Sequence, residues 1–342
     1  MTSGEIAGGD LAAHPPALPG TPSIARSYEA LVASLPVRLK ATARVLPCRL
    51  GLTPREDGGW DEFVALHPNR ELPVYAAQAS PGEGVLRLDP EGLAAFVRAH
   101  HAGGFLWLLC DRVADGQVPA DEELLELVRH YAAHWRLAMQ AATLDDALVD
   151  ELIDDAVTRW RRAIALERRG SAAENLRPEA WAIGVLDKLA WIGVPARALL
   201  LADGTGSAGV RARGFRTAHD LFLLALQAID DVVDRDEDRR LRGTDAPTEL
   251  GCSPGALLRV APMLTGLGAV VADAAGFTWL GSWLAAFTRG IRCWRLEGDA
   301  VEDELTAIAI AGRIEEAVLG DGGPNVRAAA VGAVRAAAPP SA

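Results

Sequence analysis

Cysteine is scarce in this sequence. The four cysteines, Cys48, Cys110, Cys252 and Cys293, lie far apart and form no CxxC pair. This pattern excludes the usual disulfide frameworks and zinc sites, and it is typical of reduced thiols in a cytoplasmic protein. The N-terminus shows no charged segment followed by an apolar one, so no secretory signal is expected.

Long uninterrupted apolar runs are missing as well. The least polar region, 257–287, contains Arg259 and Asp273 and is broken by Pro262 and several glycines. A membrane-spanning helix needs about 20 consecutive apolar residues. We therefore expect two buried helices in this region and no stable membrane span.

Positive charge is in the minority, because 34 basic residues stand against 46 acidic ones and the formal net charge is −12. An acidic surface argues against nucleic acid as the main partner. It does not exclude a diphosphate substrate, because bound divalent cations can reverse the local field.

Strand signals are confined to two short segments, 72–76 and 85–88, and the apolar residues elsewhere recur with a helical period. Half of the 342 residues are hydrophobic, which is enough for one large helical core or for two ordinary domains. The sequence therefore predicts an all-α bundle, in which Pro195 kinks or splits one long helix. The first expected segment, 26–47, forms one helix or a helix pair. The other expected helices are 89–118, 121–142, 145–169, 178–203, 210–240, 253–275, 277–296 and 301–317.

Composition also predicts how the chain is organised. Both ends are rich in glycine, alanine and proline, which is typical of disordered segments. We expect a disordered N-terminus at 1–22, N-terminal helices with an irregular cap at 23–88, the main helical domain at 89–318, and a disordered tail at 319–342.

The most informative segment runs from Gln227 to Asp234. Residues three and four apart share a helix face, so Gln227, Asp230, Asp231 and Asp234 should lie together, beyond the apolar stem 221–226. Crowded carboxylates repel each other unless cations lie between them, and Mg²⁺ accepts such oxygen ligands together with substrate phosphates. The segment therefore predicts a magnesium and diphosphate site, with a solvated acidic helix end as the alternative.

Asp111 and Asp115 form a second acidic pair at the end of the apolar run 105–110. Two helices that each end in acids can clamp a diphosphate through bridging metal ions, which stabilise charge on the leaving group. Two aspartates with this spacing at a helix end usually face solvent. A functional role is therefore predicted for this pair only in combination with the segment from Gln227 to Asp234.

The segment Gln227-x-x-Asp230-Asp231-x-x-Asp234 resembles the second aspartate-rich motif of trans-isoprenyl diphosphate synthases, in the class I isoprenoid synthase superfamily. Lys188 resembles the diphosphate-binding lysine of that family, and Asp111 to Asp115 occupies the place of its first motif. The resemblance covers 89–310. It implies a helical bundle around a central apolar cavity and an enzyme that uses about two or three Mg²⁺ ions, or Mn²⁺.

The first motif departs from the family pattern, because Asp111 is followed by Arg112 and no Arg-Arg pair stands nearby. Those arginines would hold the co-substrate of chain elongation, so a one-substrate terpene cyclase is the favoured function. A prenyl diphosphate synthase or a head-to-head prenyltransferase is the first alternative. A non-catalytic isoprenoid-binding or regulatory protein of the same fold is the second.

The resemblance also implies roles for individual residues. The metal ligands would be Asp111, Asp115, Asp230, Asp231 and Asp234. The diphosphate-binding residues would be Lys188, Arg112, Gln227, Arg239 and Arg240. The substrate pocket would contain Phe105, Trp107, Leu108, Trp191 and Phe222. The aromatic faces of its Phe and Trp residues can stabilise an allylic cation by roughly 1–2 kcal/mol each. Trp107 should lie one turn below Asp111 and favour a short prenyl diphosphate, and a homodimer is left open.

Overall fold

The fold is all-helical in the part of the chain that the structure, a computed structural model, describes. The described residues are 21–53, 60, 90–142, 145–168, 176–202, 208–292 and 301–319. Within them lie thirteen helices and no strand, which confirms the predicted all-α class. The candidate strands 72–76 and 85–88 lie outside the described residues, as do the two predicted disordered ends except for residues 21–22 and 319.

The chain divides into two compact units. The N-terminal unit comprises the described residues up to Thr158 together with Ala190–Ala208. The C-terminal unit comprises Arg159–Leu189 and the described residues from Gly209 onward. Helix α8 (Asp146–Arg168) contributes its first part to one unit and its last part to the other.

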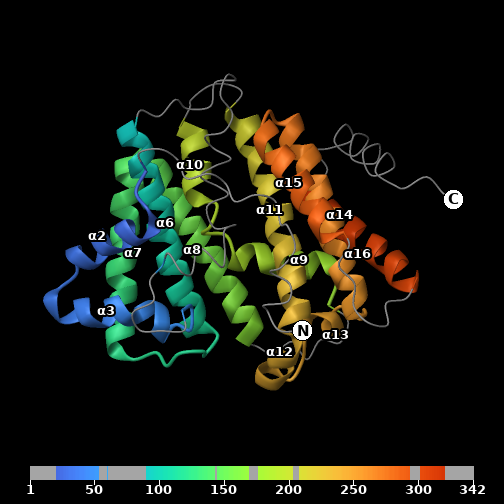
Figure 1. Cartoon of the computed structure of the whole chain (residues 1–342), viewed down its shortest axis with the longest axis horizontal. Helices are drawn as coiled ribbons and strands as arrows, with labels where there is room; N and C mark the ends of the chain where they lie inside the picture. Colours follow the sequence, from blue (N-terminus) through green and yellow to red (C-terminus); the bar gives the residue numbers. More distant parts are fainter. Residues whose placement is uncertain are drawn as a thin grey trace. The chain divides into compact units, whose positions relative to one another are not determined.

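The N-terminal unit is built around one apolar helix, α6, which packs against α2, α7 and α10 (Figure 1). The helices of this unit are α2 (Ile24–Ser34), α3 (Val37–Arg49), α6 (Pro90–Ala114), α7 (Glu122–Ala142) and α10 (Val194–Ala202). Gly103 of α6 allows α7 to approach closely, because a Cβ atom there would lie 2.8 Å from the Trp135 indole nitrogen. Small residues at such crossings let two helices bury large side chains between them.

The C-terminal unit is centred on α14, which packs against α15 and α16, while α16 packs against α9 (Figure 1). Its helices are α9 (Pro178–Lys188), α11 (Ala208–Val233), α12 (Arg235–Arg242), α13 (Ala246–Glu249), α14 (Pro254–Ala274), α15 (Thr278–Ile291) and α16 (Val301–Leu319). Helix α14 begins at a proline after the cap residue Ser253, whose hydroxyl accepts a hydrogen bond from the Ala256 N–H. Helix α12 ends at Gly243, whose φ of 78° suits glycine.

Three predicted helical segments are divided in the structure, and the first of them, 26–47, forms the pair α2 and α3. The segment 178–203 divides as expected, but the break lies at 189–193 and Pro195 stands in the first turn of α10. Proline is tolerated there because the first helical N–H groups have no partner within the helix. The segment 210–240 divides at Asp234 into α11 and α12, and the short helix α13 was not predicted.

Helices α6 and α14 are long and apolar enough, by length and composition alone, to cross a membrane. Within the most apolar window of each, 78% and 72% of the residues are buried inside the fold. Core helices of globular proteins have the same character, so this finding is compatible with the two buried helices predicted at 257–287, of which α14 is one.

Candidate functional site

The acidic end of α11 continues an apolar stem. The side chains of Leu221, Phe222, Leu224 and Ala225 are at most 1% exposed, and polarity begins at Gln227. The backbone turns at Asp234, yet the Asp234 N–H still donates to the Asp230 carbonyl at 2.8 Å. The helical spacing of the motif is therefore preserved through the break.

Asp231 points into the C-terminal unit and is only 7% exposed. Its Oδ1 accepts a hydrogen bond from Gln227 Nε2 at 2.6 Å, and its Oδ2 accepts one from Trp181 Nε1 of α9 at 3.1 Å. Burial raises the pKa of this carboxyl to about 7, against the effect of both hydrogen bonds and with the added repulsion of Asp230 and Asp238. Asp231 can therefore take up or release a proton near neutral pH.

Asp230 and Asp234 differ from Asp231 because both are exposed. Within the described residues, no three His, Cys, Asp or Glu side chains gather closely enough to form a complete metal-binding group. Mg²⁺ does not require one, since it usually binds one or two protein carboxylates and completes its octahedron with water and substrate phosphates. Two exposed carboxylates one turn apart fit that donor set.

The residues predicted to bind diphosphate are placed as follows. Arg239 forms an ion pair with Asp245, which is fully buried, and Arg240 lies 3.6 Å from Glu237. Arg112 Nη1 donates to Gln117 at 2.8 Å, and Lys188 Nζ lies 3.6 Å from Glu167. Each of these side chains, like Gln227, already contacts another side chain of the protein. A diphosphate would therefore have to share or replace those contacts.

The first acidic motif ends α6. Asp111 is partly buried and Asp115 is exposed, and the Asp115 N–H donates to the Asp111 carbonyl at 2.9 Å. Gly116, with φ of 72°, then turns the chain away. This motif belongs to the N-terminal unit and the second motif to the C-terminal unit, so their convergence on one substrate stays a prediction.

The aromatic candidates for the substrate pocket are core residues with aromatic neighbours. Phe105 packs edge-on against Tyr28 with ring centroids 4.8 Å apart, and Phe222 packs against Trp283 at 5.3 Å. Trp191 stacks on Trp135 at 5.8 Å. Trp107 and Leu108 are buried at 7% and 5% exposure. These contacts account for their burial, and their role in a pocket stays a prediction.

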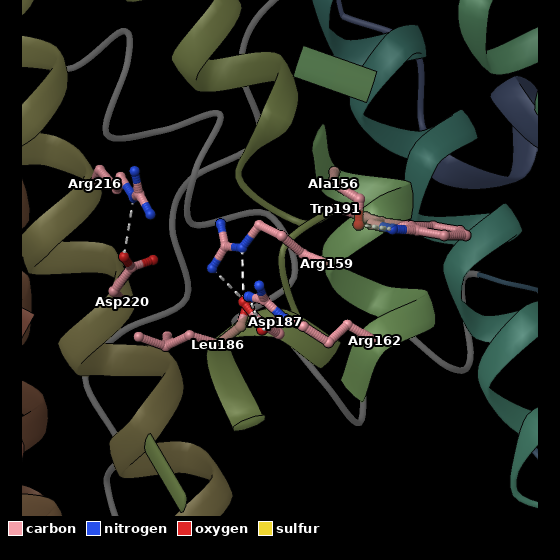
Figure 2. A network of polar contacts seen from close by, with 8 residues as sticks. All are labelled: Ala156, Arg159, Arg162, Leu186, Asp187, Trp191, Arg216 and Asp220. Atoms are coloured by element: carbon pink, nitrogen blue, oxygen red, sulfur yellow. Dashed lines mark hydrogen bonds and ion pairs between the residues drawn. The ribbon is translucent and has the colours of Figure 1, made fainter. Parts of the chain in front are cut away.

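Sequence reasoning overlooked the residues that hold the buried carboxylates. Trp181 lies far from Asp231 in the sequence, and no local pattern marks it as a partner. Asp187 is not among the predicted site residues, although its neighbour Lys188 is. It is 3% exposed and accepts hydrogen bonds from Arg159 and Arg162 (Figure 2). The sequence does contain a signal for this contact, because Arg159 and Arg162 stand three residues apart and therefore share one face of α8.

Comparison of the chain with protein-family models, curated proteins and solved structures finds no match. A functional assignment therefore rests on the residues described above. They comprise an apolar helix with an acidic end, one buried carboxyl held from two sides, and two exposed carboxylates beside it.

Proposed function

We propose that the protein is a Mg²⁺-dependent isoprenoid synthase that removes diphosphate from an allylic prenyl diphosphate, with terpene cyclisation as its reaction. The observation that carries the proposal is the end of α11, where an apolar stem leads to exposed Asp230 and Asp234 and to buried Asp231. The all-helical fold is compatible with it. The specific bundle of the class I isoprenoid synthases is part of the proposal.

In this proposal Asp230 and Asp234 would hold Mg²⁺ at the acidic end, and Asp111 and Asp115 would contribute from α6. When bound, the metal neutralises charge that develops on the departing diphosphate. Gln227 and Trp181 keep the Asp231 carboxyl in one orientation through hydrogen bonds of 2.6 and 3.1 Å. A nearby cation would favour the ionised form of Asp231 and so add negative charge where the metal is needed.

A non-catalytic isoprenoid-binding protein is the second candidate, and a specific observation favours it. In the first motif, Arg112 stands where the family pattern has a second aspartate. The candidate cations Arg112, Arg239 and Arg240 also each contact a residue of the protein itself. A protein of this kind would bind the hydrocarbon in its apolar core without releasing pyrophosphate.

Incubation with Mg²⁺ and geranyl, farnesyl or geranylgeranyl diphosphate, each with and without isopentenyl diphosphate, separates the candidates. A hydrocarbon or alcohol from a single substrate, together with pyrophosphate, is the expected result. A longer prenyl diphosphate would instead identify a prenyltransferase, and no pyrophosphate under any condition would identify a binding protein.

Two variants make this test specific to the motif. Asp234→Asn should abolish pyrophosphate release. Asp236→Asn removes the same charge two residues away from a side chain that is 86% exposed, and it should leave the rate unchanged. Equal activity of the two variants would refute the assignment of the metal site.

A further inference from the structure

A cluster of charged side chains surrounds the buried Asp187 carboxylate, where the last turns of α8 meet the end of α9 in the C-terminal unit (Figure 2). Arg159 Nε donates to Asp187 Oδ1 at 2.8 Å, and Arg159 Nη2 donates to the Leu186 carbonyl at 3.2 Å. Arg162 donates through Nε, at 2.9 Å, and through Nη2 to the other oxygen, Asp187 Oδ2. One carboxylate thus orients two guanidinium groups.

The charges in this cluster do not balance. Two guanidinium groups share the single Asp187 carboxylate, whose side chain is 4% exposed. Lys188 lies near Glu167, and Arg216 forms a pair with Asp220 on α11, so neither neighbouring pair supplies a spare negative charge. Among the residues that the structure describes, these ion pairs therefore leave an excess positive charge in a partly desolvated place, where electrostatic attraction is stronger than in water.

Hydrogen-bond donors also remain in excess. Arg159 and Arg162 use Nε and Nη2 for the contacts above, and neither Nη1 group has an acceptor among the residues that the structure describes. The Arg162 side chain is 60% exposed, so a solute can reach it, while Arg159 is held at 16% exposure. In Figure 2 the Arg216 guanidinium extends from α11 toward that of Arg159.

We propose that Arg159 and Arg162, oriented by Asp187, form a binding site for a phosphate-class oxyanion that binds without a metal ion. Phosphate oxygens match the planar fork of a guanidinium group and form short, charge-assisted hydrogen bonds with it. Asp187 holds the two arginines in place before the anion arrives, which lowers the entropic cost of binding. The site uses none of the carboxylates of the α11 motif, so it goes beyond the proposed function.

The anion can be a single phosphate or one end of a diphosphate, and calorimetric titration separates these sources. The protein is titrated with inorganic phosphate and with inorganic pyrophosphate, in EDTA and at low ionic strength. Saturable binding of at least one of them is expected. Tighter binding of pyrophosphate would assign the site to diphosphates, and equal binding would assign it to single phosphates. No binding of either anion overturns the proposal.

Arg162→Gln should weaken this binding at least about tenfold, because a charged donor group is lost. Arg161→Gln is the matched control, since it removes the same charge from the adjacent, exposed residue and should change the affinity less than about twofold. Equal losses in both variants would show general charge attraction only and would overturn the site. If Arg162→Gln does not fold, Arg162→Lys keeps the positive charge beside Asp187 but removes the fork, and it should also weaken binding.

The proposed isoprenoid chemistry can fail without affecting this site. The double variant Asp230→Asn, Asp234→Asn should release no pyrophosphate from prenyl diphosphates and should still bind inorganic anion in EDTA with unchanged affinity. Loss of anion binding in that variant would place the anion at α11 and overturn the inference. Intact anion binding in a wild-type protein without turnover would refute the proposed function alone.

Discussion

Asp187 and Asp231 show two different ways in which this chain accommodates a buried carboxyl group. Asp187 is surrounded by the positive charges of Arg159 and Arg162. Among the described residues, the side chains that donate hydrogen bonds to Asp231 are the neutral groups of Gln227 and Trp181. Neutral donors compensate less of the cost of burying a charge than guanidinium groups do, so burial raises the pKa of Asp231 to about 7.

The first prediction concerns Asp231. A carboxyl whose pKa is higher in the folded state than its usual 3.8 binds more protons when folded. Its contribution to stability is fully present below about pH 4 and is lost as pH rises toward 7. Asp231→Asn should therefore reduce the fall in the free energy of unfolding between pH 4 and 7 by on the order of 3 kcal/mol, measured by urea unfolding in EDTA.

Asp236→Asn serves as the control for this titration, because its side chain is 86% exposed. It should leave the slope of stability against pH unchanged. A wild-type protein whose stability is flat across this range would contradict the environment described for Asp231.

The second prediction concerns Asp187. Asp187→Asn leaves two guanidinium groups without their shared carboxylate and should lower the free energy of unfolding by about 3 kcal/mol. Asp154→Asn removes an ion-pair partner of Arg136 whose side chain is 73% exposed, and it should cost less than about 1 kcal/mol. Chemical unfolding measures both, and similar costs would argue against a buried, charge-compensating role for Asp187.

Among the secondary-structure elements, glycine sets how closely α14 approaches α11. A Cβ atom at Gly214 of α11 would lie 2.3 Å from the Ala275 Cβ, just after α14. A Cβ at Gly268 of α14 would lie 3.2 Å from the Ala218 carbonyl oxygen of α11. The stem of the proposed site is therefore held against α14 by backbone-to-backbone proximity, which any larger residue would disturb.

The third prediction follows from this contact. Gly214→Ala should destabilise the protein by about 2 kcal/mol, because the atom it meets is fixed to the backbone and cannot rotate away. Gly266→Ala is the matched control on α14, since the nearest atom to its Cβ would be 3.9 Å away. That control should stabilise the protein by up to about 1 kcal/mol through helix propensity, as followed by thermal unfolding. Stabilisation by both substitutions would contradict the close approach of the two helices.

At the scale of the whole molecule, the two aspartate motifs belong to different compact units. Asp115 follows α6 in the N-terminal unit, and Asp234 follows α11 in the C-terminal unit. The proposed function requires residues of both units to act on one substrate. The energetic coupling between Asp115 and Asp234 in a double-mutant cycle therefore tests whether the two motifs act on one substrate.

The fourth prediction is that Asp115→Asn and Asp234→Asn are not additive. Each should lower kcat/KM for pyrophosphate release about 100-fold or more, because several kcal/mol of charge stabilisation is lost. The double variant should be little worse than either single one, since residues that act as a unit share their effect. Asp146→Asn, at an exposed position that begins α8, is the control and should retain activity. Losses that simply multiply would argue for two independent sites.

The local parts of this fold were predictable from the sequence alone. Apolar periodicity marked most of the helices, and proline with its capping residue marks where α14 begins, because these effects act within a turn or two of the chain. The apolar stem and acidic end of α11 were predictable for the same reason. The break at Asp234 and the position of the break before Pro195 were missed, since neither follows from a local propensity.

Only the tertiary structure determined which of the acids are buried and what holds them. Gln227, Asp230, Asp231 and Asp234 were expected to share one face, but Asp231 alone turns inward to Trp181, a residue distant in the sequence. Asp187, on α9, likewise accepts hydrogen bonds from arginines of another helix, α8. Burial and partner choice depend on which helices pack together, a non-local property that periodicity does not encode. The sequence by itself therefore determined where the acidic residues gather, and the packing decided which of them are exposed and which are held within the fold.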